Sequence, residues 1–319
     1  MSPGREDVGM EEYLYTVAPK TITTVYKIIE VLVWSLMAVR LFEGNEHASL
    51  YQKYRLPPPE EVQNLIFSYL EKKKGKPFGL AVDVGCGTGQ STQILAPHFE
   101  KVVGLDISEA QIEKAKQDLY AANISYCLSS AEELPFEDCS VDLITASAAI
   151  HWFDIEKFLK EADRVLKPKG CMAFHCYNTN RTVHYRDCSE SLTNVHSEMR
   201  NFLLNYANEK YEVVKTEYQE VLDTIPYPDK QRLDNVVLNV SMSVRDLMGF
   251  TQSLGMYQTF LQTDMKAAKE LIRKTEQRFL EIMGVSSNET NVELSIKHYG
   301  ILACKPSQGR SSCAKPLIG

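Results

Sequence analysis

The sequence has no excess of positive charge. Its 319 residues include 35 lysines and arginines against 42 aspartates and glutamates, which gives a formal net charge of −7. Because the phosphates of DNA and RNA bind best to a basic surface, this balance argues against a nucleic-acid partner. Hydrophobic residues make up 44% and charged residues 24% of the chain, which is ordinary for a globular protein with a substantial core.

The sequence also lacks closely spaced cysteine pairs. Eight cysteines are present, but none forms a C-x-x-C pair, so a zinc site is not expected. The cysteines are scattered through apolar segments, which favours reduced, buried thiols over a disulfide framework. We therefore expect a cytoplasmic protein without a bound metal.

The apolar run near the N-terminus is too short to span a membrane. Residues 31–39 read VLVWSLMAV, and these nine residues fall short of the roughly 20 that a bilayer requires. No small-residue cleavage site follows the run, so a signal peptide is not expected either. A helix packed on the body of the protein explains the run best, and an interfacial membrane helix is the alternative.

From about residue 78 the sequence alternates between short apolar segments and helical patterns. The apolar segments favour buried strands; they are 78–84, 101–107, 124–130, 141–147 and 171–177. Helical spacing of apolar residues lies between them, at 91–99, 109–119 and 154–166. Ser108 and Gln111 are expected to cap the second of these helices. The alternation predicts a doubly wound α/β fold with helices on both faces of a parallel sheet.

A glycine-rich loop, AVDVGCGTGQ at residues 81–90, follows the first predicted strand. Gly85 and Gly87 allow the backbone to turn tightly beside a ligand, and amides at the start of the next helix can bind an anionic group. That group is either a phosphate or an amino-acid carboxylate. A dehydrogenase loop needs a small residue three positions after Gly87, where this chain has Gln90.

Asp106 ends the second predicted strand. Its carboxylate can accept hydrogen bonds from two ribose hydroxyls, as an acid at this place does in dinucleotide folds. The alternative is a charge that stabilises the helix N-terminus at Ser108. The glycine loop and Asp106 together, in this order of strands, indicate a nucleoside-containing cofactor.

Four segments carry a resemblance to a known family: VDVGCGTG, VVGLDIS, SSAEELPFEDCSVDLITASAAIHWF and EADRVLKPKG. They resemble the successive motifs of class I S-adenosylmethionine-dependent methyltransferases. YQKYR, HW after the fourth strand and LMGFTQSLGMYQ are similar, more narrowly, to the trans-aconitate methyltransferase-like group of small-molecule enzymes. The resemblance implies S-adenosyl-L-methionine as the cofactor. It also implies a seven-stranded, mostly parallel Rossmann-like sheet whose last strand is antiparallel.

The resemblance also implies which residues bind the cofactor. They are Tyr51, Asp83, Gly85, Gly87, Asp106, Ile107, Ser130, Ala131 and Glu132. Asp83 and the two glycines would line the methionine end of the cofactor, and Asp106 would bind the ribose. Ile107, Ser130, Ala131 and Glu132 would contact the adenine. The family commonly has aspartate where this chain has Ser130, which can accept a hydrogen bond but carries no charge.

His151 and Trp152 are the predicted catalytic residues. They follow the fourth strand, at the edge of the sheet where open α/β folds bind ligands. His151 either removes a proton from a hydroxyl or amine or donates a hydrogen bond to a carboxylate, and the sequence leaves both open. Trp152 offers an aromatic face to the sulfonium cation, with core packing as the alternative.

Four residues are predicted to contact the acceptor substrate: Tyr54, Tyr177, Arg181 and Tyr257. Arg181, Arg186 and Arg245 could clamp an acidic substrate, although each is alternatively a surface charge. We therefore predict a methyltransferase of a small molecule, with a carboxylic acid as one acceptor class. A cofactor-binding protein without turnover is the alternative, and a nucleotide-dependent dehydrogenase is third because of Gln90. No oligomeric state is predicted.

The predicted domain organisation surrounds the cofactor-binding core. The segments are an N-terminal extension (1–36), a helical segment (37–76), the core (77–177), a helical insertion that covers the substrate (178–241), C-terminal helices with a closing β-hairpin (242–306) and a disordered tail (307–319). Ser243 and Asp246 are expected to cap a helix, and the hairpin is expected to turn near residues 297–300.

Overall fold

The computed structural model describes residues 44–307 except residue 119. The expected N-terminal extension, the apolar run at 31–39 and nearly all of the expected tail lie outside the described residues. All described residues fall within one compact unit of the chain.

Helices and strands alternate over most of the described chain. The helices are α2 (Asn45–Tyr54), α3 (Glu60–Lys74), α4 (Gln90–Leu95), α5 (Glu109–Gln117), α6 (Ile155–Val165), α7 (Ser189–Leu203), α8 (Tyr211–Lys215), α9 (Gln219–Thr224), α10 (Val244–Gln252), α11 (Gly255–Thr263) and α12 (Met265–Met283). Three short 3-10 helices are η1 (Ala96–His98), η2 (Ile150–Trp152) and η3 (Leu204–Tyr206). The strands are β1 (Leu80–Val84), β2 (Lys101–Asp106), β3 (Ile124–Leu128), β4 (Val141–Ser147), β5 (Leu166–His184), β6 (Asp229–Ser243) and β7 (Asn291–Cys304).

The strands form one seven-stranded sheet in the order β3-β2-β1-β4-β5-β7-β6. The first five strands pair in parallel, and β7 runs antiparallel to both β5 and β6. The structure therefore confirms the predicted fold class, a mostly parallel Rossmann-like sheet of seven strands whose last strand is antiparallel.

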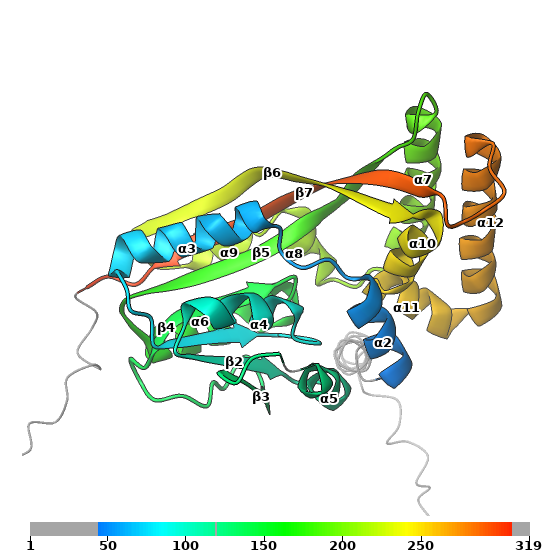
Figure 1. Cartoon of the computed structure of the whole chain (residues 1–319). Coiled ribbons are helices and arrows are strands. Elements are labelled where there is room, and N and C mark those ends of the chain that lie inside the picture. The colour runs from blue at the N-terminus through cyan, green and yellow to red at the C-terminus, as the bar shows by residue number, and fades with distance from the viewer. Residues whose placement is uncertain (1–43, 119, 308–319) are drawn as a thin grey trace, which may run out of the picture. The chain divides into compact units, whose positions relative to one another are not determined.

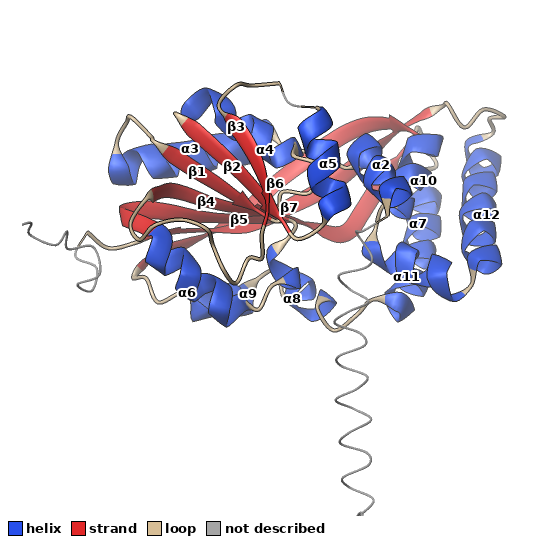
Figure 2. Cartoon of the chain, turned by 90° about the horizontal axis from the view of Figure 1, so that it is seen from below, coloured by secondary structure: helices blue, strands red, loops and turns tan. Residues whose placement is uncertain are grey.

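Helices cover both faces of the parallel part of the sheet (Figure 2). Helices α3, α4 and α5 pack on one face, where their apolar side chains join those of Ala81 and Val102. Helices α6 and α9 pack on the other face with Val82 and Val84. Successive residues of a strand thus face opposite layers, which explains why these strands appear in the sequence as continuous apolar runs.

Strands β5, β6 and β7 run beyond the parallel strands toward α7, α10 and α12 (Figure 1). Their far ends and these helices, with α11, enclose a third apolar cluster that includes Tyr177, Val183, Phe250 and Tyr257. Three of the four residues predicted to contact the acceptor therefore lie in this third cluster or pack against it: Tyr54, Tyr177 and Tyr257.

Two predictions about the C-terminal half are wrong. Residues 292–305 do not form a hairpin, because 291–304 are the single strand β7. Its partner β6 lies partly inside the segment predicted to be a helical insertion, and residues 178–184 of that segment continue β5. Gly300 is not a turn residue: a Cβ there would clash with the backbone oxygen of Phe174 in β5, so the glycine permits close approach of two strands.

Both predicted helix caps are present. Ser108 Oγ accepts a hydrogen bond from the Gln111 backbone amide at 3.3 Å, and Ser243 Oγ accepts one from Asp246 at 3.0 Å. Within the described part of the chain, no helix is long and apolar enough to cross a membrane, and no cluster of potential ligands could hold a metal ion.

Most of the described cysteines are free thiols. They are Cys86, Cys127, Cys171, Cys176, Cys188 and Cys304.

Candidate active site

The glycine loop between β1 and α4 is tightly packed against the segment that follows β4. Gly85, Gly87 and Gly89 all have positive φ angles, of 68°, 54° and 85°. A Cβ at Gly85 would lie only 2.5 Å from that of Ala149. Glycine is therefore required at Gly85 both by its backbone angle and by the space available.

The Asp106 carboxylate is fixed at the carboxyl end of β2. Its Oδ2 accepts a hydrogen bond from the Gly87 amide and its Oδ1 accepts one from the Ser108 amide, both at 2.9 Å. Burial raises the pKa of Asp106, and these amide hydrogen bonds oppose that rise. The contacts hold Asp106 between the glycine loop and α5, where it was predicted to bind the ribose.

Two aliphatic side chains beside Asp106 are exposed. Ile107 is 56% exposed and Leu128, which pairs with Asp106 across β2 and β3, is 54% exposed. Apolar side chains of this kind can flank the flat face of an adenine. Ile107 was predicted for this role. Leu128 was not, although its place at the carboxyl end of β3 gives the same signal.

Unpartnered polar groups lie beside the glycine loop and fit the methionine end of the cofactor. The amide of Gln111 and the hydroxyl of Thr88 are buried and have no hydrogen-bond partner within the described residues. Gln111 Oε1 and the ring of Tyr51 come within 3.6 Å and 3.5 Å of a Cβ position at Gly87. Buried polar groups normally have partners, so this cradle suits the amino and carboxylate groups of an amino acid.

Asp83 has a different environment from Asp106. Its two carboxylate oxygens accept hydrogen bonds from Thr92 at 2.7 Å and from Thr145 at 2.8 Å. The side chain is fully buried, and burial raises its pKa to about 6. Asp83 therefore ties β1 to α4 and β4, and its predicted contact with the cofactor stays a prediction.

The loop after β3 holds the three residues predicted for the adenine edge. Ser130 hydrogen-bonds the carboxylate of Glu132, and Glu132 Oε1 accepts a hydrogen bond from the Asp154 amide at 2.8 Å. Ala131 is buried. The loop is thereby joined to the start of α6.

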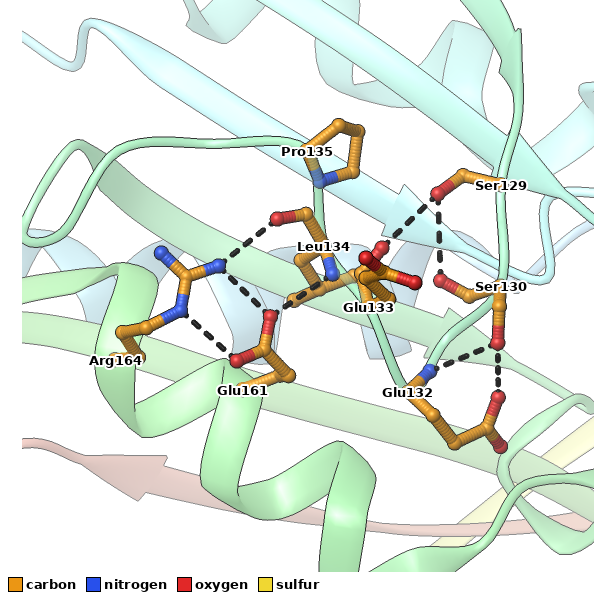
Figure 3. A pocket seen from close by; sticks show the side chains of 8 residues that line it. All are labelled: Ser129, Ser130, Glu132, Glu133, Leu134, Pro135, Glu161 and Arg164. Atoms are coloured by element: carbon orange, nitrogen blue, oxygen red, sulfur yellow. Dashed lines mark hydrogen bonds and ion pairs between the residues drawn. The ribbon is translucent and has the colours of Figure 1, made fainter.

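A polar cavity of about 640 Å³ lies along this loop. Figure 3 shows the Arg164 guanidinium pointing at the carboxylate of Glu161 and at the carbonyl of Leu134. Because Arg164 is satisfied by these contacts, the cavity offers no free cation for an acidic ligand. It borders the predicted adenine end and holds none of the predicted catalytic residues.

His151 and Trp152 lie in η2, directly after β4, as predicted. His151 Nδ1 lies 3.0 Å from the hydroxyl of Tyr218. The Trp152 ring lies 3.7 Å from a Cβ position at Gly255, at the start of α11. Burial, followed by the charges of Arg55 and Lys210, lowers the pKa of His151 to about 3, so its ring is neutral at physiological pH.

Helix α2 connects the glycine loop to α10. The Arg55 guanidinium lies over the Tyr51 ring at 4.7 Å and donates hydrogen bonds to the Tyr177 hydroxyl and to the Ser253 carbonyl. Tyr54 packs its ring against Gly249 of α10, leaving no room for a Cβ there. Tyr54 therefore has a clear packing role, whereas the sequence predicted a substrate contact.

Arg181 is buried without an anionic partner. It is 4% exposed and lies over the rings of Phe250 at 4.7 Å and Tyr177 at 5.6 Å. Its Nε and Nη2 have no hydrogen-bond partner within the described residues. Burial lowers the pKa of Arg181 to about 10, so the side chain remains a cation at neutral pH.

Three other buried nitrogen atoms in this region have no hydrogen-bond partner among the described residues. They are His196 Nδ1, His298 Nε2 and Arg55 Nε. His196 and His298 lie close enough to Arg181 for its charge to lower their pKa values. The region therefore contains several potential donors and no described carboxylate to occupy them.

A chain of side chains leads from the end of β4 toward Arg181. Ser147 Oγ lies 3.3 Å from His175 Nδ1, and His175 Nε2 lies 2.8 Å from His298 Nδ1. Burial lowers the pKa values of both histidines, to about 3 and about 4. The chain joins the carboxyl end of β4 to His298, near the buried cation, through neutral groups.

The other two arginines considered as substrate clamps lie apart from this region. Arg186 is exposed and lies over the Tyr185 ring. Arg245 forms ion pairs with Asp246 and Glu289 at the surface. Of the three arginines, Arg181 alone is buried.

Several residues of the site were missed as functional residues in the sequence. Arg55 lies inside YQKYR, but the sequence predicts no separate role for it. For Gln111 the sequence predicts only a role in capping a helix. His298 and Tyr218 gave no local signal, because each meets its partner across a large separation in sequence: 123 residues from His175 and 67 from His151.

The sheet order, the glycine loop after β1 and the acid that ends β2 define an S-adenosylmethionine-binding α/β fold of class I. A family model described as "Methyltransferase domain" matches residues 82–174. A solved structure from Anaeromyxobacter dehalogenans, titled as a candidate type II methyltransferase, has a similar fold. It is 22% identical, with a TM-score of 0.60, and the match covers 79% of this chain and 99% of that one.

Two curated proteins are also similar. A Dictyostelium discoideum protein named as a candidate methyltransferase is 30% identical over 227 residues, 70% of this chain and 81% of that protein. A Saccharomyces cerevisiae protein named as a probable S-adenosylmethionine-dependent methyltransferase is 27% identical over 182 residues, 52% of this chain and 61% of that protein. The chain belongs to the class I S-adenosylmethionine-dependent methyltransferases, and S-adenosyl-L-methionine is its methyl donor. A dehydrogenase and a binding protein without turnover are thereby set aside.

Proposed function

We propose that the protein methylates a carboxylate group of a small-molecule acid. The observation that carries this proposal is Arg181, a buried guanidinium that has two unpartnered nitrogen atoms and no anion beside it among residues 44–307 as described. Leaving a charge buried without a partner costs several kcal/mol. A carboxylate is the ligand whose geometry matches the paired donors of a guanidinium, so a bound acid would remove that penalty.

The side chains around Arg181 support a partly apolar acceptor site. Phe250 and Tyr177 provide aromatic walls, and His298, whose pKa is lowered by burial and by the charge of Arg181, has a buried Nε2 without a partner within the described residues. Such a combination of apolar walls with a few placed polar groups is typical of small-molecule sites. The resemblance of YQKYR, HW and LMGFTQSLGMYQ to the trans-aconitate methyltransferase-like group is in keeping with an acidic acceptor.

The chemistry of an acid also suits the electrostatics of His151. When bound, S-adenosylmethionine supplies an electrophilic methyl group. A carboxylate is nucleophilic without losing a proton, so the protein has to orient it and exclude water rather than supply a strong base. His151, with its low pKa, is poorly suited to accept a proton from a hydroxyl or amine.

A panel of acceptors tests this proposal. Small mono-, di- and tricarboxylic acids, phenols and amines are each incubated with the protein and S-adenosylmethionine carrying a labelled methyl group. We expect turnover with acids alone, yielding products that mild alkali hydrolyses as methyl esters. Turnover confined to amines or phenols would refute the proposal.

Arg181→Met tests the residue that carries the proposal. Loss of a charged hydrogen-bonding partner costs about 1.5–3 kcal/mol, so kcat/KM for the acid should fall by about tenfold or more. Affinity for S-adenosylmethionine should be unchanged. Arg273→Met, which removes a surface arginine of α12 that pairs with Glu270, is the matched control and should leave both values unchanged.

A further inference from the structure

The hydroxyl of Tyr218 lies 3.0 Å from His151 Nδ1. Tyr218 is fully buried and belongs to the turn between α8 and α9, far along the chain from the glycine loop. A neutral histidine has one protonated ring nitrogen and one that accepts. The partner of Nδ1 therefore decides what Nε2 can offer to a substrate.

The backbone of this turn is strained. Glu217 and Tyr218 have φ angles of 50° and 64°, in the left-handed region that residues with a Cβ seldom adopt. Each such residue costs about 1–3 kcal/mol, and strain of this kind persists where the surrounding structure enforces it, often at functional sites. Two consecutive strained residues that end in a contact with a catalytic histidine call for a functional explanation.

Glu217 anchors the turn to three strands. Its carboxylate accepts hydrogen bonds from Asn178 of β5 at 3.0 Å and from Lys297 of β7 at 3.3 Å. Its carbonyl accepts one from Arg232 of β6 at 3.0 Å. The extended antiparallel part of the sheet thus holds the turn in place, and the turn presents Tyr218 to η2.

The contacts of Tyr218 determine where its proton goes. The hydroxyl has two neighbours that could accept it, His151 Nδ1 and the sulfur of Cys176. The Cys176 thiol itself points at the Tyr177 carbonyl, at 3.8 Å. Sulfur is a weak acceptor and an imidazole nitrogen a much better one. This difference favours the arrangement in which the Tyr218 hydroxyl donates to His151 Nδ1, which leaves the proton of the imidazole on Nε2.

We propose that Tyr218 is a positioning residue that fixes His151 as its Nε2–H tautomer, so that His151 donates a hydrogen bond to an oxygen of the acceptor instead of removing a proton. This role rests on the proposed carboxylate acceptor, because a carboxylate needs orientation and no base. The sequence left both roles of His151 open, and the contact with Tyr218 selects one.

The charges around His151 agree with a neutral donor. Arg55 from α2 and Lys210 ahead of α8 face it, and both disfavour a second proton on the ring. Burial raises the pKa of Tyr218 far above its ordinary value, so its hydroxyl keeps its proton throughout the physiological range. Neither group changes its protonation state near neutral pH.

The tautomer is measured directly by nitrogen NMR of protein with 15N-labelled histidine, without any acceptor present. The His151 signals are assigned from their loss in His151→Gln. We expect Nδ1 to be the unprotonated nitrogen and Nε2 to carry the proton. In Tyr218→Phe we expect a mixture of tautomers. A proton on Nδ1 in the wild type would overturn the proposal.

Activity measurements on His151 variants distinguish a hydrogen-bond donor from a general base. Glutamine can place an amide N–H near the position of Nε2 but cannot accept a proton at neutral pH, whereas His151→Ala offers neither. We expect His151→Gln to keep kcat within about tenfold of wild type and His151→Ala to fall well below it. Equal losses of about 100-fold or more in both variants, the scale of general-base catalysis, would overturn the proposal.

Tyr218→Phe should lower kcat by about tenfold, the scale of lost positioning, while its affinity for S-adenosylmethionine stays unchanged. Tyr299→Phe is the matched control, because it removes a neighbouring buried hydroxyl that donates to the Val214 carbonyl. It should change neither kcat nor the tautomer. If the acceptor panel yields only amines while Nε2 carries the proton, the proposed substrate class fails and the tautomer assignment stands.

Discussion

At the scale of single residues, the two acids of the cofactor half have different roles. Asp83 is fully buried and each of its oxygens accepts a threonine hydroxyl, so a ligand has no access to its remaining lone pairs. Asp106 accepts one backbone amide at each oxygen, which leaves lone pairs for further donors. We therefore expect Asp83 to support the loop and Asp106 to contact the ribose.

Asp106→Ala should weaken binding of S-adenosylmethionine without unfolding the protein. The loss of charge-assisted hydrogen bonds should cost about 1.5–3 kcal/mol, roughly tenfold or more in affinity. Titration calorimetry on the folded variant measures this change. An unchanged dissociation constant would place the ribose elsewhere.

Asp83 should make stability depend on pH. Its pKa in the folded protein is raised to about 6 from 3.8, so the folded state binds the proton more tightly than the unfolded state does. Its contribution to stability is therefore present below about pH 4 and is lost as the pH rises to about 6. The loss amounts to about 3 kcal/mol at 1.36 kcal/mol per pKa unit.

Asp83→Asn removes this ionisation. The difference in unfolding free energy between wild type and Asp83→Asn, measured in urea at several pH values, should shift toward the variant by about 2 kcal/mol between pH 4 and 6 and by about 3 kcal/mol in total at higher pH. A difference that is independent of pH would show that Asp83 does not titrate in this range.

At the scale of helices and strands, the contact between α2 and α10 sets the acceptor side of the site. Helix α2 carries Tyr51 and is followed directly by Arg55, and its position depends on the Tyr54 ring packing against Gly249. Any Cβ at Gly249 would overlap that ring, with Cε1 at 2.6 Å. A single methyl group can therefore displace the helix that carries two site residues.

Gly249→Ala should destabilise the protein by about 1–3 kcal/mol, the usual penalty for overpacking, and lower kcat/KM. Shortening the opposing side chain in the double variant Tyr54→Leu, Gly249→Ala should restore part of both losses. Urea unfolding and kinetics on the four proteins of this double-mutant cycle measure the coupling. Strictly additive effects would show that the two side chains do not interact as the structure indicates.

The elements that the sequence predicted correctly are those with a strong local pattern. Strands β1, β2 and β4 are buried on both faces and appear as apolar runs, and α12 shows helical spacing throughout. Strand β6 is an edge strand, with Val237 56% exposed, so its mixture of charged and apolar residues resembles a loop or a helix. The sequence wrongly predicts a turn at Gly300, because glycine is common both in turns and where two strands approach closely.

At the scale of the whole molecule, the two halves of the site differ in how far they could be predicted. The cofactor half is built from short connections after β1, β2 and β3, so its residues are recognisable from local motifs. The acceptor half is assembled from α2, η2, the turn at Tyr218 and the extended ends of β5 and β7. Pairs such as His175 with His298 depend on strand register, which no local pattern in the sequence specifies.

This assembly should make function and stability oppose each other at Arg181. A buried cation without a partner destabilises the folded protein, so Arg181→Met should raise the free energy of unfolding by about 1–3 kcal/mol while lowering turnover of the acid. Arg273→Met should change neither.

The true acceptor, at 100 times its dissociation constant, should stabilise the wild type by about 2.7 kcal/mol and Arg181→Met much less. Thermal and urea unfolding with and without the acid measure both effects. A less stable Arg181→Met protein would mean that the guanidinium is satisfied by its surroundings inside the protein and is not available to an acid.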